Sequence, residues 1–227
     1  MNTGELMFRI IFLFLIAHAC LSAEIKLLYS AALIDDQFDS RKEEYIKCLD
    51  ILNRYGYLPR TYIVDSCAWQ PRSFFDSYTQ HVLYANTNNL RLINKGVNEA
   101  TAMMAALDHF AFDDEDMIIK LTGRYFLDSN KFLTTVEDHP DVDVFLKYVW
   151  TGSVFTGCYA MRCKNMKEFL RGIDLVELEK KLICIETKAM EYINKLKEEK
   201  PEKVFVLEHL DLSAPIFGYG TRDYTKW

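Results

Sequence analysis

The chain has 227 residues, of which 50% are hydrophobic and 26% charged, so it can bury a full core and is not disordered by composition. A formal net charge of −6 and the absence of a lysine–arginine tract argue against nucleic-acid binding, which normally needs a basic face. No Gly–Pro-rich linker, repeat or low-complexity segment divides the sequence. We therefore expect residues 24–227 to form one domain.

The first 23 residues differ from the rest. Residues 7–23 are almost wholly apolar, with Arg9 ahead of the apolar stretch and small residues around Ala23. The apolar core is shorter than the roughly 20 residues of a membrane span. We interpret it as a secretory signal cleaved near Ala23, which predicts a secretory-pathway or exported protein. An uncleaved single-pass anchor, which alone would bring membrane contact, and an apolar start to a cytosolic protein are the alternatives.

The cysteines do not form a metal-binding pattern. Cys20 lies in the N-terminal segment, and the other five are an odd number without a Cys-x-x-Cys spacing, so we predict no zinc site. Most of them lie in apolar runs, where a reduced cysteine acts as a small hydrophobe. That interpretation conflicts with an oxidising compartment, and the sequence does not resolve the conflict.

The first part of the chain alternates strands and helices. An apolar run at 25–32 predicts a strand, and apolar residues at helical spacing predict a helix at 39–54, with Asp39 or Ser40 as its N-cap. A second strand at 60–64 ends at Asp65. A strand–helix–strand unit of this length predicts parallel neighbours joined by a right-handed crossover.

The same rhythm continues toward the C-terminus. We predict strands at 81–85 and 117–121, on either side of a helix at 95–110, and later helices at 164–171 and 175–197 before a short strand at 204–207. Residues 142–148 and 153–161 alternate apolar and polar side chains, which predicts a pair of exposed or edge strands. The pattern as a whole predicts an α/β fold, with three layers around a mostly parallel sheet.

Two cations mark the end of the strand predicted at 117–121. Ligands of open α/β sheets bind beyond the carboxyl ends of strands, which is where Lys120, Gly123 and Arg124 fall. A buried ammonium needs a carboxylate or phosphate partner, and a guanidinium grips phosphate with two donors. We also expect Gly123 to let the backbone approach a ligand closely. These residues predict a binding site for an anion.

Other candidate binding residues lie at neighbouring element ends. Lys95 and Gly96 open the helix predicted at 95–110, where unpaired N–H groups attract anions, although capping plus a solvated lysine explains them equally well. Asp65 closes the second strand, where an acid accepts hydrogen bonds from a ribose hydroxyl or a base N–H. An ordinary turn residue is the alternative for Asp65.

These segments together resemble the GT-A class of nucleotide-sugar glycosyltransferases. The resemblance spans residues 25–163, through the segments 30–32, 63–66, 94–100 and 118–121. More narrowly, residues 120–125 (Lys-Leu-Thr-Gly-Arg-Tyr) resemble the Lys-x-x-Gly-Arg-Tyr block of glycosyltransferase-like proteins. The resemblance implies a GT-A-like fold that binds a nucleoside-diphosphate sugar across the strand ends, with Asp65 near the base or ribose.

The sequence departs from this class at its metal site. The class usually has an Asp-x-Asp pair at the fourth strand to hold a divalent metal, whereas this chain has Thr122, Gly123 and Arg124. Asp141-Val142-Asp143 has the right letters but precedes a strand. Either Lys120 and Arg124 neutralise the leaving diphosphate without a metal, or the protein only binds, as an inactive scaffold of the same fold.

An inverting sugar transfer needs a base for the acceptor hydroxyl. The candidates are Glu186, Glu208, His209 and Asp211, and Glu208–His209 at a strand end is preferred over the others; a solvated pair is the alternative. We expect transfer from a nucleotide sugar to an unknown glycan, lipid or protein acceptor. A nucleotidyltransferase is less favoured, because no glycine-rich, lysine-bearing loop follows the first strand.

Overall fold

The computed structural model describes residues 23–33, 38–67, 73–88, 91–150, 153–215 and 224–226. The predicted signal segment lies almost wholly outside these residues, so secretion stays a prediction of the sequence. No helix in the described part of the chain is long and apolar enough to cross a bilayer.

The described elements follow the alternation that the sequence predicts. The α-helices of the described residues are α2 (Phe38–Arg54), α3 (Lys95–Phe110), α4 (Lys131–Asp138), α5 (Cys163–Arg171), α6 (Leu175–Lys181) and α7 (Ile185–Glu199). Short 3-10 turns are η2 (Leu58–Arg60), η3 (Phe74–Ser77) and η4 (Pro201–Lys203). The strands are β1 (Ile25–Ala31), β2 (Thr61–Asp65), β3 (Val82–Tyr84), β4 (Met117–Thr122), β5 (Phe126–Leu127), β6 (Val144–Leu146), β7 (Tyr148–Trp150), β8 (Ser153–Val154), β9 (Cys158–Arg162), β10 (Val204–Val206), β11 (Leu212–Pro215) and β12 (Tyr224–Lys226).

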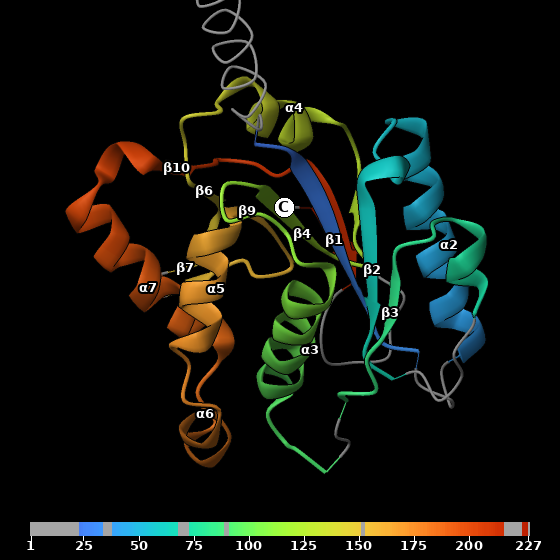
Figure 1. The fold of residues 1–227 in the computed structure, drawn as a ribbon, viewed down its shortest axis with the longest axis horizontal. Helices are drawn as coiled ribbons and strands as arrows, with labels where there is room; N and C mark the ends of the chain where they lie inside the picture. The colour runs from blue at the N-terminus through green and yellow to red at the C-terminus, as the bar shows by residue number, and fades with distance from the viewer. Residues whose placement is uncertain are drawn as a thin grey trace, which may run out of the picture.

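A mostly parallel sheet forms the centre of the molecule, with the strand order β10-β6-β9-β4-β1-β2-β3 (Figure 1). The β1–β2, β1–β4, β2–β3 and β6–β10 pairs are parallel, which confirms the predicted parallel neighbours. Only β9 runs against its neighbours β4 and β6. The carboxyl ends of β1, β2, β3, β4, β6 and β10 therefore lie along one edge of the sheet.

The two faces of the sheet bury separate apolar clusters. Leu27 and Tyr29 of β1 pack in one cluster with α2, α4, β5 and β11, whereas Leu28 packs in the other with α3, α5 and α7. Figure 1 shows α3 and α5 side by side, with α2 apart from both. Because both faces are covered, the central strands read as continuous apolar runs. The predicted three-layer α/β architecture is confirmed.

The prediction of a pair of exposed or edge strands at 142–148 and 153–161 holds only where β7 and β8 pair outside the central sheet, and it was wrong for β6 and β9. β9 lies between β4 and β6, and every residue of β6 and β9 is buried. Polar side chains in β9 are compatible with burial because they find partners, as when Arg162 pairs with Asp143 at 3.5 Å and donates to the Glu115 carbonyl at 2.8 Å. The edges of the sheet are β3 and β10 instead.

The single long helix predicted at 175–197 is two helices. α6 ends at Lys181, its C-cap Leu182 has a left-handed backbone with φ of 52°, and α7 begins at Ile185. No Gly or Pro marks the break. Asn94, outside both helices, binds there through its side-chain NH₂ group, which donates to the Leu178 carbonyl at 2.8 Å and the Ile183 carbonyl at 2.7 Å.

Helix α3 has the predicted bounds, 95–110, and its cap explains why. The Asn94 side-chain oxygen accepts a hydrogen bond from the Gly96 N–H at 3.0 Å, which satisfies one of the free donors of the first turn. By contrast, α2 begins at Phe38, so Asp39 and Ser40 lie inside its first turn and neither is the N-cap.

The five described cysteines are free thiols, as the interpretation of reduced cysteines requires. Cys48, Cys158 and Cys163 are buried, and burial raises the pKa of the Cys48 thiol to about 12. A thiol that stays protonated is a poor nucleophile and metal ligand. These buried cysteines are therefore core residues.

Replacing Asn94 with Ala is expected to lower the free energy of unfolding by about 2–3 kcal/mol, because the cap is lost and two carbonyls lose their donor. Asn130→Ala is the matched control, since Asn130 precedes α4 without making a side-chain cap bond. We expect that variant to stay within about 0.5 kcal/mol of the wild type. Urea unfolding of both variants measures the difference, and equal losses would contradict this account of the α3–α6–α7 junction.

Candidate functional site

A cavity of about 870 Å³ opens along the edge where the parallel strands end. Of the residues that the sequence predicts as ligands, Lys95, Gly96, Lys120 and Arg124 line it. Its lining also includes Ala32, Arg41, Tyr45, Ser66, Asn88, Asn98, Glu99, Phe155, Thr156 and Glu186. Asp65, Gly123, Glu208 and His209 are not among the lining residues.

Lys120 is the most deeply buried charge of the site, with 1% of its surface exposed. Strand alternation places it on the α3 side of β4, the same side as Ile118. Its ammonium donates to Glu99 Oε1 at 2.5 Å, to Thr122 Oγ1 at 2.8 Å and to the Thr156 carbonyl at 2.8 Å. An ammonium has three protons, so the protein itself uses all of them. The buried ammonium of Lys120 therefore has its charged partner within the protein, the carboxylate of Glu99.

Arg124 differs, because no hydrogen bond or ion pair joins its guanidinium to any other described residue. The side chain is half-buried and lines the cavity. Burial raises the pKa of the Tyr45 hydroxyl, and the charges of Arg41 and Arg124 oppose that rise, so both cations lie close to Tyr45. Arg41 also donates to the Ala32 carbonyl at 2.8 Å. Two arginines thus flank the ends of β1 and β4.

Gly123 has a different role from the expected approach to a ligand. A Cβ at this position would lie 2.6 Å from the Tyr45 ring and 2.7 Å from Tyr29 Cζ. The Gly123 carbonyl also accepts a hydrogen bond from the Tyr29 hydroxyl at 2.7 Å. Glycine is needed here because two tyrosines pack against the backbone, and this packing fixes where Arg124 leaves the strand.

Lys95 and Gly96 lie at the cavity, but their polar groups have partners in the protein. The exposed Lys95 ammonium donates to the Leu92 carbonyl at 3.1 Å. The Gly96 N–H is bound by the Asn94 cap, and a Cβ on Gly96 would lie 3.1 Å from Ile185 Cβ. Gly96 therefore allows α3 and α7 to pack closely, which brings residues of both helices to the cavity.

Asp65 is fully buried at the end of β2 and only half satisfied. Its Oδ1 accepts from the backbone N–H of Cys67 at 3.1 Å and of Leu33 at 3.4 Å. Its Oδ2 is buried and has no partner within the described residues. Burial raises the pKa of the Asp65 carboxyl, and the two backbone bonds only partly oppose the rise. Its chain neighbours Ser66 and Ala31 line the cavity.

Glu99 and Glu186 are the carboxylates that the structure brings to the cavity. Glu99, in the second turn of α3, pairs with Lys120, and Glu186, in the first turn of α7, accepts from Thr156 Oγ1 at 3.0 Å. The sequence singled out Glu186 only as one base among several, and it did not single out Glu99 or Arg41. A signal for Glu99 was its position on the helix that precedes the Lys120 strand.

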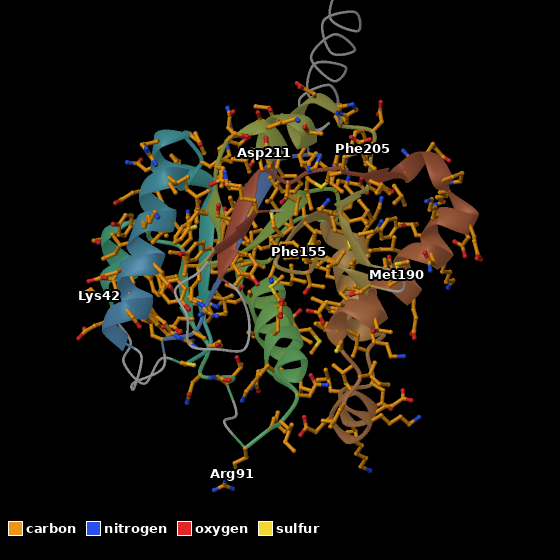
Figure 2. All side chains as sticks on the ribbon, turned by 180° about the vertical axis from the view of Figure 1, so that it is seen from behind. Lys42, Arg91, Phe155, Met190, Phe205 and Asp211 are labelled. Atoms are coloured by element: carbon orange, nitrogen blue, oxygen red, sulfur yellow. The ribbon has the colours of Figure 1, made fainter. Side chains whose placement is uncertain are left out.

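The preferred bases, Glu208 and His209, are not brought to this cavity. Both are exposed after β10, the outermost strand of the sheet, and the Glu208 carbonyl accepts a bond from Lys147. Asp211 accepts from Ser129 Oγ at 3.0 Å and also lies outside the lining. In Figure 2 Asp211 lies toward the end of the molecule opposite Arg91, with the lining residue Phe155 between them.

The residues at the end of β4 do not fit a divalent cation. A metal there would meet the positive charges of Lys120 and Arg124, and Glu99 is already paired with Lys120 at 2.5 Å. The alternative carboxylate Asp143 pairs with Arg162 at 3.5 Å and does not line the cavity. Within the described ranges no group of three or more His, Cys, Asp or Glu side chains is arranged to hold a metal.

A second cavity, of about 640 Å³, lies at the opposite edge, near the amino ends of β1 and β4. Its charged residues are engaged with the protein, since Arg60 pairs with Glu137 at 3.2 Å and Arg162 pairs with Asp143. Ligands of parallel sheets bind at carboxyl ends, so the first cavity is the candidate site.

No family model and no curated protein sequence matches the chain. Among solved structures it is similar to a glycosyltransferase involved in the glycosylation of the major capsid of PBCV-1, with 11% identity, 81% of each chain covered and a TM-score of 0.50. At this identity the likeness shows the fold alone, and the chain has a GT-A-like α/β fold.

Two further structures are also similar in outline. The chain aligns with apo mouse xyloside xylosyltransferase 1 at 12% identity and a TM-score of 0.46, over 82% of this chain and 85% of that one. It aligns with 4-diphosphocytidyl-2C-methyl-D-erythritol synthase at 13% identity and a TM-score of 0.49, over 77% and 86% of the two chains.

Burial of Asp65 makes stability depend on pH in a defined direction. Its native pKa is raised above the ordinary value of 3.8, so above that value the native state binds more protons than the unfolded state. Its contribution to stability therefore falls as pH rises through the raised native pKa. Asp65→Asn removes this contribution, and we expect the variant to gain stability relative to the wild type between pH 4 and pH 7. Urea unfolding at both pH values measures it; a constant difference would contradict the burial argument.

Proposed function

We propose that this protein is a glycosyltransferase that binds a nucleoside-diphosphate sugar in the cavity at the strand ends and transfers the sugar to an acceptor without a metal clamp. The single observation that carries the proposal is Arg124. A half-buried guanidinium without a partner among the described residues, in a cavity of this fold, is available to bind an anion with charge-assisted hydrogen bonds. The diphosphate of a nucleotide sugar supplies one.

In this proposal the nucleoside lies at the ends of β2 and β3. The unpartnered Oδ2 of Asp65 is an acceptor for a ribose hydroxyl or a base N–H, once that group reaches the buried carboxylate. Nearby, Asn98 donates to Asn88 at 2.7 Å, so two amides line the same end of the cavity. The diphosphate then extends past β1 to β4, between Arg41 and Arg124.

The arginines offset the charge that develops as the diphosphate leaves, which is the role of the metal in the GT-A class. Lys120 supports this arrangement without touching the phosphate, because its three protons bind Glu99, Thr122 and Thr156. We assign the general base to Glu186 instead of Glu208 or His209. Glu186 lines the cavity and is oriented by Thr156.

Arg124→Ala is expected to weaken nucleoside-diphosphate binding roughly 10- to 100-fold, since a hydrogen bond to a charged group contributes about 1.5–3 kcal/mol. Calorimetric titration and thermal shift with a panel of nucleoside diphosphates measure the loss. Arg171→Ala is the matched control, because Arg171 is exposed and pairs with Asp108 on the outer surface. If the Arg124 variant binds nucleotides as tightly as the wild type, the diphosphate does not contact Arg124.

Glu186→Gln is expected to lower the rate of donor hydrolysis, in which water replaces the acceptor, on the order of 10²- to 10⁴-fold, because the base that deprotonates the water is lost. Glu191→Gln, further along α7 and paired with Lys188 on the surface, is the control. The wild-type rate should be the same with and without EDTA. If Glu208→Gln loses activity and Glu186→Gln stays active, the general base is Glu208, after β10, and not Glu186. A folded, nucleotide-binding wild type without hydrolysis or transfer would favour the inactive scaffold.

A further inference from the structure

Glu99 and Glu186 form one acidic end of the cavity although they come from different helices. Lys120 joins them, because its ammonium binds Glu99 Oε1 at 2.5 Å and the carbonyl of Thr156 at 2.8 Å, and the Thr156 hydroxyl donates to Glu186 Oε1 at 3.0 Å. In each carboxylate, Oε1 thus accepts a hydrogen bond from the protein. No hydrogen bond from a described residue reaches the Oε2 atom of either.

This end of the cavity offers hydrogen-bond acceptors and almost no charged donor. Lys120 has no proton left to give a ligand. Two carboxylates and one ammonium leave a net charge of one negative unit at this end. The guanidinium of Arg124, which the proposed function pairs with the diphosphate, lies between the two sets of charges: it acts on the hydroxyls of both Tyr45 and Tyr125, and Glu99 and Glu186 also act on Tyr125.

The order of the strands places this acidic end next to the diphosphate. Across the edge of the sheet the strands follow the order β3, β2, β1, β4 and β9. With the proposed nucleoside end at β2 and β3, the arginines follow at β1 and β4, and Thr156 lies two residues before β9. This step rests on the proposed function: with the diphosphate at the arginines, the sugar lies between Glu99 and Glu186.

We propose that Glu99 and Glu186 form a sugar subsite that accepts an uncharged, hydroxyl-bearing sugar and rejects sugars that carry a carboxylate, such as uronic acids. Hydroxyl groups of a neutral sugar donate to the free carboxylate oxygens. A uronate at the same position meets two like charges and no available ammonium proton, and such juxtaposition is strongly unfavourable. The donor class of the enzyme is therefore a neutral nucleotide sugar.

The experiment compares donors that share a nucleotide and differ only at C6 of the sugar. Isothermal titration with UDP, UDP-glucose and UDP-glucuronate gives three affinities; if guanosine diphosphate is the nucleotide that binds, GDP-mannose and GDP-mannuronate take their place. We expect the neutral sugar to bind at least about tenfold more tightly than the uronate. Equal or tighter binding of the uronate overturns the proposal.

A charge-neutral variant tests the subsite directly. Glu186→Gln keeps the shape and an acceptor oxygen, and we expect it to narrow the preference for the neutral sugar, taken as the ratio of the two affinities, at least threefold. Glu99→Gln would instead leave the buried Lys120 ammonium without its carboxylate partner. Glu191→Gln should leave the preference unchanged. A preference that Glu186→Gln does not alter overturns the assignment to these carboxylates.

The proposed function and the sugar subsite can be rejected separately. A folded wild type that binds none of the nucleotides removes the proposed function, and this inference with it. A wild type that binds nucleoside diphosphates through Arg124, yet shows no preference for a neutral sugar, removes the sugar subsite alone and leaves the proposed function standing.

Discussion

The buried ammonium of Lys120 is the constraint on which the rest of the site depends. A charge with 1% exposure is stable only when its partners are fixed in place, because an unpaired ammonium in a low-dielectric interior is very costly. Its partners come from α3, from β4 itself and from the turn before β9. Satisfying one lysine therefore fixes α3 and the β9 turn against the end of β4, where the cavity opens.

Close packing at two glycines completes this arrangement. Gly96 lets α3 approach Ile185 of α7, and Gly123 lets Tyr29 and Tyr45 close over the backbone beyond β4. The first contact brings Glu99 and Glu186 to the same cavity. The second sets the point at which Arg124 leaves the sheet. The glycines act on the site indirectly, through the elements that they allow to meet.

Sequence patterns correctly predicted those elements whose bounds depend on interactions between residues close in the sequence. Helix α3 has the predicted bounds because an asparagine cap and apolar periodicity agree with each other. The α6–α7 break escaped prediction because its partner is Asn94, more than 80 residues earlier in the chain. β9 was misassigned because the polar residues of 153–161 belong to β8 and the turn after it, whereas β9 itself, Cys158–Arg162, is buried throughout.

For the residues of the candidate site, too, the sequence predicted local properties, and the fold decided the long-range partners. Burial of Lys120 required a carboxylate or phosphate, but only the fold decides between them, since Glu99 lies 21 residues away in sequence. Glu208 follows a strand as a catalytic residue often does, yet the order of the sheet makes β10 its outermost strand. Strand order is a property of the whole chain, and it separates Glu186 from Glu208.

Arginines in place of a metal, as we propose, change what the site demands of its ligand. A metal is held by carboxylate ligands and can exchange, whereas a guanidinium stays charged and belongs to the chain itself. In the order of the strands, Arg41 lies at the end of β1, Arg124 follows β4, and Glu186 lies beside Thr156 before β9, so the lining changes from positive to negative charge along the edge of the sheet. A nucleotide sugar has the matching polarity, since its charge lies on the diphosphate and its neutral hydroxyls lie beyond. The proposed direction of binding thus follows from the protein's own charges, before any acceptor arrives.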